Sequence, residues 1–582
     1  MIRVPLRPLA RVLRARADGE DPDRIEAEAR AARMRARQRA ERLRAERRLF
    51  LLAGTFLLAF GVVGGRMAMV AASPPAEAGS GFSHPAIASQ RADILDAEGR
   101  ILATNLATHS LYAQTRDLVD PEAAALGLAR IFPDLDADAL RKAFSRRKFV
   151  WIKLSLSPEQ RQAVHDLGEP GLLFGPREIR LYPNGRIAAH ILGGTRFGDQ
   201  GVHAAEIIGT AGVELRFDAF LRDPNAGGRP LQLSIDLSVQ AAVESGLAGG
   251  RASMNAKAAS AVLMEAATGR VVAMASLPDF DPNSRPRITG KAADSPVFNR
   301  AAQGVYEVGS SLKIVTAALA MEAGLANPST MIDTAGPLRI DGFRIRDFHD
   351  HGPQLSLRDV IVESSNIGTS HLAVQAGTAR QKAFLAALGL TEPVPVELPE
   401  ARRAAPLLPN PWTKLSTMTV SYGHGLAVTP LHVAAAYASL VNGGRRVQPT
   451  LLATPQPLGP RVVSEAVSRD IRRMLRAVVT EGTASLGEVP GYRVGGKTGT
   501  ADKPNDRGSY HDDKVLATFA AVFPADDPAY VLVVTLDEPV DRTGRKPRRT
   551  AGWTAVPVTA EIIRRIAPLM NMAPLPKQGR AP

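Results

Sequence analysis

The chain has 582 residues, of which 45% are hydrophobic and 22% charged, a composition typical of two to four folded domains and not of a disordered or wholly membrane-embedded chain. Its net charge is +14, but the first 48 residues hold 15 arginines against eight acidic residues, and no later segment joins a basic stripe to aromatic side chains. This pattern argues against nucleic acid as a partner, and the absence of cysteine excludes disulfides, thiolate metal sites and a cysteine nucleophile.

An uncharged apolar run over 49–65 follows the basic head. As a helix it is about 25 Å long, slightly short of a hydrocarbon core of about 30 Å, and snorkelling of Arg66 allows the span to reach residue 72. The arginine-rich side is expected to remain in the cytoplasm. The sequence therefore predicts a cytoplasmic tail over 1–48, one transmembrane anchor over 49–72 and an exported remainder. The alternative is a cleaved signal peptide that ends near Ser73.

The segments beyond the anchor differ in residue composition and in hydrophobic pattern. Residues 73–85 are rich in Pro, Gly, Ser and Ala and predict a linker. Over 86–235, short strand-like runs alternate with turns, as in ILDAEGRILATN, and two modest helical stretches interrupt them. We expect an elongated β-rich domain there, which we call the pedestal, without a chemical constellation of its own.

The hydrophobic pattern changes again over 236–570. An apolar hairpin at 258–276 and a strand pair at 515–539 lie at opposite ends of this segment. Helices rich in Ala and Leu are predicted between them, at 311–324, 366–376, 430–442 and 464–479. Strands at both ends predict one antiparallel sheet closed by distant segments, with flanking helices and a helical subdomain. The fold class is therefore α+β, and 571–582 form a C-terminal tail.

Ser310 and Lys313 are the first candidates for chemistry. In GSSLK they stand three apart at the predicted start of a helix, so they share a face. A serine there lies at the positive end of the helix dipole, and its hydroxyl becomes a nucleophile only when a neighbouring base takes its proton. A lysine can be that base if burial or another cation lowers its pKa. A chance Ser-x-x-Lys on a surface helix remains the alternative for this pair alone.

Two further motifs follow in the sequence. ESSN places Ser364 and Asn366 at a helix entrance, where a hydroxyl and an amide can relay a proton and hold a carbonyl, although an ordinary N-cap is a common alternative. GGKTGT predicts a strand in which glycine allows a ligand backbone to approach and the polar side chains face an anionic substrate. The polar and glycine positions are Lys497, Thr498, Gly499 and Thr500.

The segment 491–498, GYRVGGKT, also satisfies the letters of a phosphate-binding P-loop. A P-loop needs a buried strand before it and a helix after it. Here a proline-containing, weakly apolar stretch precedes the motif, and GTADKPNDRG follows, which cannot form a helix. A nucleotide-binding function is therefore not expected.

Ser-x-x-Lys at 310–313, Ser-x-Asn at 364–366 and Lys-Thr-Gly at 497–499 form one ordered set. With this set the chain resembles the class B penicillin-binding proteins, most closely the septal, FtsI-type peptidoglycan D,D-transpeptidases of α-proteobacteria. RADILDAEGRILA, REIRLYPNGRIAAHILGGT and GTAGVELRFD resemble pedestal motifs of that family, with Ala92 in place of a usual glycine. SYGHGLAVTPLHVAAAYASLVNGG and AGWTAVPV resemble its transpeptidase domain.

The resemblance implies a role for each motif residue. Ser310 would attack the carbonyl between the two terminal D-alanines of a stem peptide, with Lys313 as the base. Ser364 would pass the proton to the departing amine, and Asn366 would hold the substrate amide and position Lys313. Lys497 would supply positive potential, Thr498, Gly499 and Thr500 would bind the terminal carboxylate, and the backbone N–H groups of Ser310 and Thr500 would form the oxyanion hole.

The resemblance also implies no metal or other cofactor, acylation of Ser310 by β-lactams, and a periplasmic catalytic domain on an inner-membrane anchor. Partners would be stem peptides, an FtsW-type glycan polymerase and other division-complex membrane proteins. Arg91, Arg180 and Glu214 match charged pedestal positions that brace the two domains in relatives, with a surface ion pair as the alternative. The DFHDHG loop at 347–352 is expected to be a cleft rim and not a metal site, and His424 is expected to be structural.

Other functions remain open at this point. An elongation-type transpeptidase would carry the same motifs, and a D,D-carboxypeptidase or β-lactamase would use water as the acceptor. A hydrolase needs a carboxylate that activates water, and no residue is assigned to that role. A non-enzymatic division scaffold or sensor would not need the complete motif set.

Overall fold

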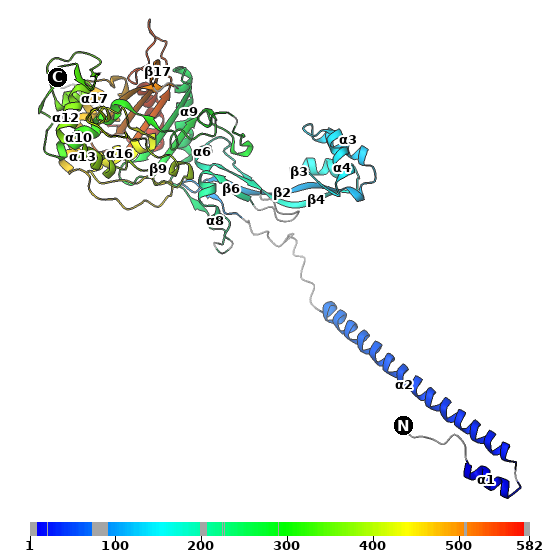
Figure 1. Cartoon of the computed structure of the whole chain (residues 1–582). Helices are drawn as coiled ribbons and strands as arrows, with labels where there is room; N and C mark the ends of the chain where they lie inside the picture. The colour runs from blue at the N-terminus through cyan, green and yellow to red at the C-terminus, as the bar shows by residue number, and fades with distance from the viewer. Residues whose placement is uncertain are drawn as a thin grey trace. The chain divides into compact units, whose positions relative to one another are not determined.

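The computed structural model describes residues 9–19, 21–72, 91–197, 207–223, 225, 227–288, 290–505 and 509–575 (Figure 1). By their contacts the residues divide into two compact units, 1–86 and 87–582. The predicted linker over 73–85 lies outside the described residues, and only 571–575 of the predicted C-terminal tail lie within them.

The N-terminal unit contains helix α1 (Leu9–Ala17) and the long helix α2 (Pro22–Ala72). The Ala-, Arg- and Glu-rich sequence at the start of α2 favours helix, and Arg30 pairs with Glu26 one turn away at 3.1 Å. The same helix continues through Arg47–Met67, which has a mean hydropathy of 1.8, is long enough to cross a membrane and is not buried. The head and the apolar segment therefore share one helix of 51 residues.

The pedestal is organised around one long strand, β2 (Ile101–Gln114). Two antiparallel neighbours, β3 (Phe149–Leu156) and β4 (Leu172–Leu181), pair with it. Its first residues pair with β1 (Ile94–Leu95), which in turn runs parallel to β7 (Leu231–Gln232). Five of the strands that lie within 86–235 thus form one sheet assembled from distant segments.

Helices and a hairpin complete the pedestal. Around β3 and the end of β2, α3 (Pro121–Ile131), α4 (Ala137–Arg146) and α5 (Pro158–His165) enclose a separate apolar core (Figure 1). Nearer the C-terminal half of the unit lie β5 (Gly194–Phe197), β6 (Ile207–Ala211), α6 (Ala189–Leu192), α7 (Gly212–Arg216) and α8 (Asp218–Leu221).

The second half of the unit contains a five-stranded antiparallel sheet in the order β16-β17-β18-β8-β9. Its strands are β8 (Ala258–Glu265), β9 (Val271–Leu277), β16 (Gly495–Pro504), β17 (Tyr510–Phe523) and β18 (Tyr530–Asp537). The hairpin β8–β9 joins the C-terminal strands because β18 pairs with β8, from Tyr530 opposite Glu265 to Asp537 opposite Ala258. This confirms the prediction of one sheet closed by distant segments. β16 lies at the edge of this sheet.

Helices cover both faces of the sheet. α9 (Leu237–Ser253) and α18 (Ala555–Leu569) pack on each other and on the sheet, whereas α16 (Pro430–Val441) contacts β8, β17 and β18 without packing on α18, so it lies on the opposite face. The remaining helices are α10 (Lys313–Glu322), α11 (Leu357–Val362), α12 (Asn366–Ala376), α13 (Thr378–Ala387), α14 (Pro399–Arg402), α15 (Lys414–Val420) and α17 (Glu465–Thr480). Short strand pairs join β10 (Tyr306–Glu307) to β15 (Ala427–Val428), β11 (Met331–Asp333) to β14 (Gln354–Ser356) and β12 (Leu338–Ile340) to β13 (Phe343–Ile345).

The base of the pedestal and the sheet domain share one apolar core. Ile94, Leu102 and Val213 belong to the same buried cluster as the sheet strands. Ser234 donates its amide to the carbonyl of Leu451 at 2.8 Å, just before the predicted domain boundary at 235/236. The two domains are therefore packed as a single compact unit.

Candidate active site

Ser310 lies in a 3-10 turn, η5 (Gly309–Leu312), and α10 begins at Lys313. The sequence predicted an α-helix from residue 311, whereas in the structure the 3-10 turn continues to Leu312 and the α-helix starts two residues later than predicted. Side chains at i and i+3 of a 3-10 turn lie almost directly above one another, so this turn still brings Ser310 and Lys313 onto one side. The turn is anchored from behind, because Tyr437 donates its hydroxyl to the carbonyl of Ser311 at 2.7 Å.

Gly309 brings the serine turn against strand β16. Its φ of +54° is in the left-handed region, and a Cβ there would lie 2.5 Å from the carbonyl oxygen of Thr500. Gly499 faces the same turn, since a Cβ on it would lie 2.3 Å from Ser311 Oγ. Only glycines permit this contact, which holds the backbone of Ser310 beside that of Thr500. The backbone N–H groups of these two residues are the ones expected to form an oxyanion hole.

Ser364 stands just before α12 in a strained conformation. Its φ is +64°, which costs a residue other than glycine about 1–3 kcal/mol. The next residue, Ser365, caps α12 by accepting the Gly368 amide at 2.9 Å. Between the end of α11 and this cap, the backbone turns so that the Ser364 hydroxyl meets two lysine side chains.

Lys313 and Lys497 converge on Ser364. Lys313 Nζ lies 3.1 Å from Ser364 Oγ and also donates to the Ser364 carbonyl, while Lys497 Nζ lies 3.0 Å from the same Oγ. Lys497 further contacts the carbonyl of Thr498 at 3.2 Å and its hydroxyl at 3.4 Å. Side chains from three motifs that lie far apart in the chain thus meet at one oxygen atom.

Burial sets the protonation of both lysines. Each side chain is fully buried. Burial, together with the nearby positive charge of Lys497, holds the pKa of Lys313 well below its usual value, with Asp347 opposing the shift. Burial lowers the pKa of Lys497 to about 7. A neutral Lys313 next to a protonated Lys497 is the arrangement that a general base and an electrostatic anchor require.

The remaining residues of the third motif lie on β16. Thr498 exchanges a hydrogen bond with Thr483, their hydroxyl oxygens 2.8 Å apart, and Thr500 Oγ1 accepts the amide of Ala551 at 3.0 Å. Lys497 and Thr498 are within a ten-residue strand, and the next element that the structure describes is the strand β17 and not a helix, so the P-loop alternative is wrong. As an edge strand, β16 can pair with the backbone of an extended peptide.

Asp347 is a site residue that the sequence interpretation did not identify. Its carboxylate accepts the amides of Asn366 and Ile367 at 2.5 and 3.0 Å and the hydroxyl of Ser365 at 2.6 Å. An acidic side chain at the N-terminus of a helix stabilises it, and here it also places a negative charge near Lys313. An available signal was the aspartate that opens DFHDHG, in the segment that precedes the Ser-x-Asn motif.

Asn366 makes a different contact from the one expected. Its Nδ2 donates to the carbonyl of Arg346 at 2.9 Å, and among the described residues no hydrogen bond joins its side chain to Lys313. The asparagine is therefore attached to the loop 346–347, on the side of the cleft that faces a large groove.

This groove has a volume of about 790 Å³ and begins at Asn366 and Asp347. Its walls are formed by β13 and the three residues after it (343–348), part of α15, the loop that holds Tyr422 and His424, and Asp502 and Tyr510 of the β16–β17 hairpin. His424 packs between the two tyrosine rings, with centroid distances of 5.4 and 6.2 Å. His424 is thus a wall residue of the groove and does not touch the lysines.

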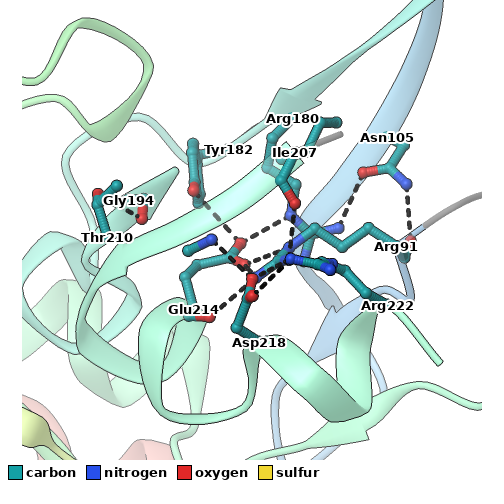
Figure 2. A network of polar contacts seen from close by, with 11 residues as sticks. Arg91, Asn105, Arg180, Tyr182, Gly194, Ile207, Thr210, Glu214, Asp218 and Arg222 are labelled. Atoms are coloured by element: carbon teal, nitrogen blue, oxygen red, sulfur yellow. Dashed lines mark hydrogen bonds and ion pairs between the residues drawn. The ribbon is translucent and has the colours of Figure 1, made fainter. Parts of the chain in front are cut away.

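The predicted pedestal residues form a second, separate cluster. Arg91 donates to Glu214 at 2.7 Å and pairs with Asp218 at 2.7 Å, while Arg180 Nε lies 2.7 Å from the other Glu214 oxygen (Figure 2). The side chains of Arg91 and Glu214 are fully buried, so the surface ion pair considered from the sequence is wrong. The cluster lies within the pedestal; its neighbour Gly212 donates its amide to Glu400 of α14 at 3.0 Å.

Two family models match parts of this chain. A family model described as the penicillin binding protein transpeptidase domain matches residues 259–563, and one described as the penicillin-binding protein dimerisation domain matches 86–229.

Individual relatives and structures are also similar. The chain is 35% identical over 538 residues to a probable peptidoglycan D,D-transpeptidase FtsI of Caulobacter vibrioides, covering 90% of this chain and 89% of the relative. It is 28% identical over 556 residues to the peptidoglycan D,D-transpeptidase FtsI of Escherichia coli K12, with coverages of 90% and 92%. A crystal structure of penicillin binding protein 3 from Mycobacterium tuberculosis in complex with aztreonam superimposes with a TM-score of 0.63 at 26% identity, covering 84% of this chain and 97% of that chain.

Proposed function

This chain belongs to the class B penicillin-binding proteins, and we propose that Ser310 is the nucleophile of its peptidoglycan D,D-transpeptidase reaction. The protein is an FtsI-type, serine-dependent acyltransferase that cross-links stem peptides at the division septum and is acylated by β-lactams. The observation that carries the residue assignment is the convergence of Lys313 and Lys497 on Ser364 Oγ beside the Ser310 turn.

The first half of the reaction forms an acyl-enzyme. Neutral Lys313 takes the Ser310 proton, and Ser310 Oγ attacks the carbonyl carbon of the penultimate D-alanine. The C–N bond to the terminal D-alanine then breaks, and a proton relayed through Ser364 leaves with its amine. The backbone N–H groups of Ser310 and Thr500 bind the oxyanion, which is the largest electrostatic contribution expected in acyl transfer.

The substrate is held by the edge of β16. Its terminal carboxylate meets the protonated Lys497 with Thr498 and Thr500, and Gly499 lets the strand lie close to the serine turn. Asn366 contacts the substrate amide from the opposite wall. In the second half of the reaction, the amine of a stem peptide on a neighbouring peptidoglycan strand attacks the carbonyl carbon of the acyl-enzyme ester. The ester bond to Ser310 Oγ then breaks, and Ser310 recovers its proton.

The same proposal includes the membrane topology. The arginines at 1–48 support a cytoplasmic N-terminus, and Arg47–Met67 serves as a single inner-membrane anchor for a periplasmic catalytic domain. Within the described residues the pedestal contains no glycan-polymerising module that we identify, so an FtsW-type polymerase and other division proteins are the proposed partners.

A fluorescent penicillin tests the assignment of Ser310. The full-length chain in detergent is expected to be labelled covalently, and Ser310→Ala is expected to abolish the label. Ser311→Ala is the matched control, because Ser311 is adjacent, buried and without a hydrogen-bond partner for its hydroxyl among the described residues. Covalent labelling of Ser310→Ala would show that another residue is the nucleophile.

A further inference from the structure

The loop that connects β18 to α18 carries a dense positive charge. Residues 541–550 have the sequence DRTGRKPRRT, with five basic residues and one acidic residue. Arg542, Arg545 and Lys546 are exposed, and within the described part of the chain none of them makes an ion pair or a side-chain hydrogen bond. Like charges this close together repel one another, and an anion bound among them would relieve that repulsion.

Contacts at the base of the loop hold its two ends together. Asp541 and Arg548 form an isolated antiparallel bridge, with amide-to-carbonyl distances of 2.8 and 3.0 Å. The buried Asp541 carboxylate accepts the Arg548 Nε–H at 2.8 Å and the Thr543 amide at 2.9 Å. The Arg548 guanidinium is stacked on the ring of Trp553 at 3.8 Å. The residues between the bridge partners, 542–547, which we call the loop tip, are therefore presented to solvent from a closed base.

The acidic residues at the base of the loop already have cationic partners. Asp537 and Glu538, which directly precede the loop, contact Lys503 at 2.6 and 2.8 Å. Asp541 is occupied by Arg548. The loop tip itself contains no acidic residue, so the charge of its three basic side chains is available to a ligand.

The far end of the loop is joined to the strand that holds the substrate. Ala551 donates its amide to Thr500 Oγ1 at 3.0 Å. A Cβ on Gly552 would lie 2.6 Å from the carbonyl oxygen of Thr483, whose hydroxyl oxygen is 2.8 Å from that of Thr498. Thr498 and Thr500 are two positions apart in a strand, so they share one face of β16. The loop thus returns to β16 at the two threonines that are proposed to hold the terminal carboxylate.

The proposed reaction determines which substrate reaches this face of β16. Thr498 and Thr500 hold the carboxylate of the D-alanine that leaves. Formation of the new amide is the chemical reverse of cleavage of the old one, so the acceptor nitrogen attacks from the place that the leaving nitrogen vacated. The rest of the acceptor then extends away from Ser310 on the side where the D-alanine was bound. The segment 541–552 lies on that side.

We propose that the loop tip binds the acceptor strand, and that Arg542, Arg545 and Lys546 attract carboxylates of the acceptor stem peptide that do not react. The ligand class is an anionic peptide with one free amine. Its amine forms a C–N bond with the acyl carbon, the C–O bond to Ser310 Oγ breaks, and the amine proton returns to Ser310. This inference rests on the proposed transpeptidase function and adds an acceptor surface to it.

A thioester donor and two acceptors test the proposal on the full-length chain in detergent. Attack by Ser310 on an acyl–D-alanyl-thioglycolate breaks the C–S bond and releases thioglycolate, and the acyl-enzyme then partitions between water and the acceptor. Each acceptor is a stem tripeptide with one free amine and a free carboxylate beside it, which suits the pocket at Thr498 and Thr500. The more distant carboxylates are free in one acceptor and converted to carboxamides in the other.

The wild type is expected to favour the acceptor with free distant carboxylates by about threefold to tenfold in the ratio of aminolysis to hydrolysis, the scale of one or two exposed ion pairs. This holds at an ionic strength of about 0.01 M, where the Debye length is about 30 Å. At about 1 M salt the Debye length is about 3 Å, and the preference should fall towards onefold.

The variant Arg542→Gln/Arg545→Gln/Lys546→Gln is expected to lose the preference at low salt. Two control variants should retain it. Arg542→Lys/Arg545→Lys keeps the charge of the loop tip. Arg402→Gln/Arg403→Gln removes two exposed arginines at the end of α14, a helix that packs against α7 of the pedestal.

The outcomes separate this inference from the proposed function. Absence of a preference in the wild type, its persistence in the triple variant or its insensitivity to salt overturns the inference. If the triple variant changes the rate of thioglycolate release and not the partition, the loop tip reads the donor and the assignment to the acceptor is wrong. Penicillin labelling of Ser310 in each variant reports independently on the nucleophile and on folding, so a failure of the proposed function is recognised by loss of the label in the wild type.

Discussion

Lys313 and Lys497 place their Nζ atoms 3.1 and 3.0 Å from the same atom, Ser364 Oγ, and both side chains are fully buried. Two ammonium groups at this separation repel each other, and burial removes the water that would screen them. The pair therefore retains one proton over a pH range in which isolated lysines would both be charged.

The rate of acylation by a penicillin should depend on pH with a bell shape. It rises as Lys313 loses its proton and becomes a base, and it falls above about pH 7, because burial lowers the pKa of Lys497 to about 7 and the anchor charge is lost. The measurement is the second-order rate constant of labelling between about pH 5 and 10, which covers most of the interval between the ordinary pKa values of carboxyl groups and lysines, about 4 to 10. In Lys497→Arg, whose guanidinium stays charged, any residual activity should no longer fall at alkaline pH. A wild-type rate that keeps rising through this range contradicts the assignment.

Lys497→Met should abolish acylation and raise thermal stability at neutral pH. Lys497 keeps its proton up to 10.5 in the unfolded chain but, when folded, loses it at a pKa of about 7. Between these values the unfolded state binds more protons, so wild-type stability rises with pH by about 1.4 kcal/mol per unit from this group. The difference in melting temperature between variant and wild type should therefore be largest at pH 7 and narrow towards pH 10.

Lys503 on the same strand is the control, because its pKa shifts in the direction opposite to that of Lys497. Its contacts with Asp537 and Glu538, at 2.6 and 2.8 Å, raise its pKa against the effect of burial. The stability that Lys503 contributes to the fold is thus fully present below the pKa that this lysine has in the unfolded chain. It is lost as the pH rises through the higher pKa that the lysine has in the folded chain. Lys503→Met should lower the melting temperature at pH 7. Equal shifts for the two variants would show that the buried-lysine argument is wrong.

Asp347→Asn should weaken the start of α12 and shift the acidic limb of the acylation profile. The carboxamide can replace only part of the three hydrogen bonds at the helix N-terminus, so a loss of about 0.5–2 kcal/mol is expected. Because Asp347 raises the pKa of Lys313, removing its charge should move the acidic limb to lower pH. Asp350→Asn, in the same loop with a single bond to the Gly352 amide, should leave that limb in place.

Glu214→Gln should destabilise the pedestal and spare the chemistry. The substitution leaves Arg91 and Arg180 buried without their shared counter-charge, and breaking such a cluster costs about 3–5 kcal/mol. Thermal unfolding should show an earlier transition, while penicillin labelling persists below it. Glu98→Gln, an exposed carboxylate in the same domain, should change neither. Loss of labelling at a temperature where the fold is intact would assign the cluster a role in the site.

Much of the architecture was predictable from local pattern. The hairpin at 258–276, the helix at 366–376 and the strand carrying Lys497 were recognisable because apolar periodicity and glycine turns act over a few residues. The 3-10 turn at Ser310 was not predicted, since contact with Gly423 and Thr500, and not local propensity, determines the conformation of Gly309. Asp347 was missed for the same reason: its partners are 18 to 20 residues away in sequence.

The sequence by itself determined which residues we propose for the chemistry, because the order and type of the three motifs constrain an acyl-transfer site even when each motif is weak. Only the tertiary structure decided the protonation and the surroundings of those residues. Burial of Lys313 and Lys497 and the strained turn at Ser364 arise from packing between distant segments, and desolvation is a property of the folded neighbourhood that no single stretch of sequence contains.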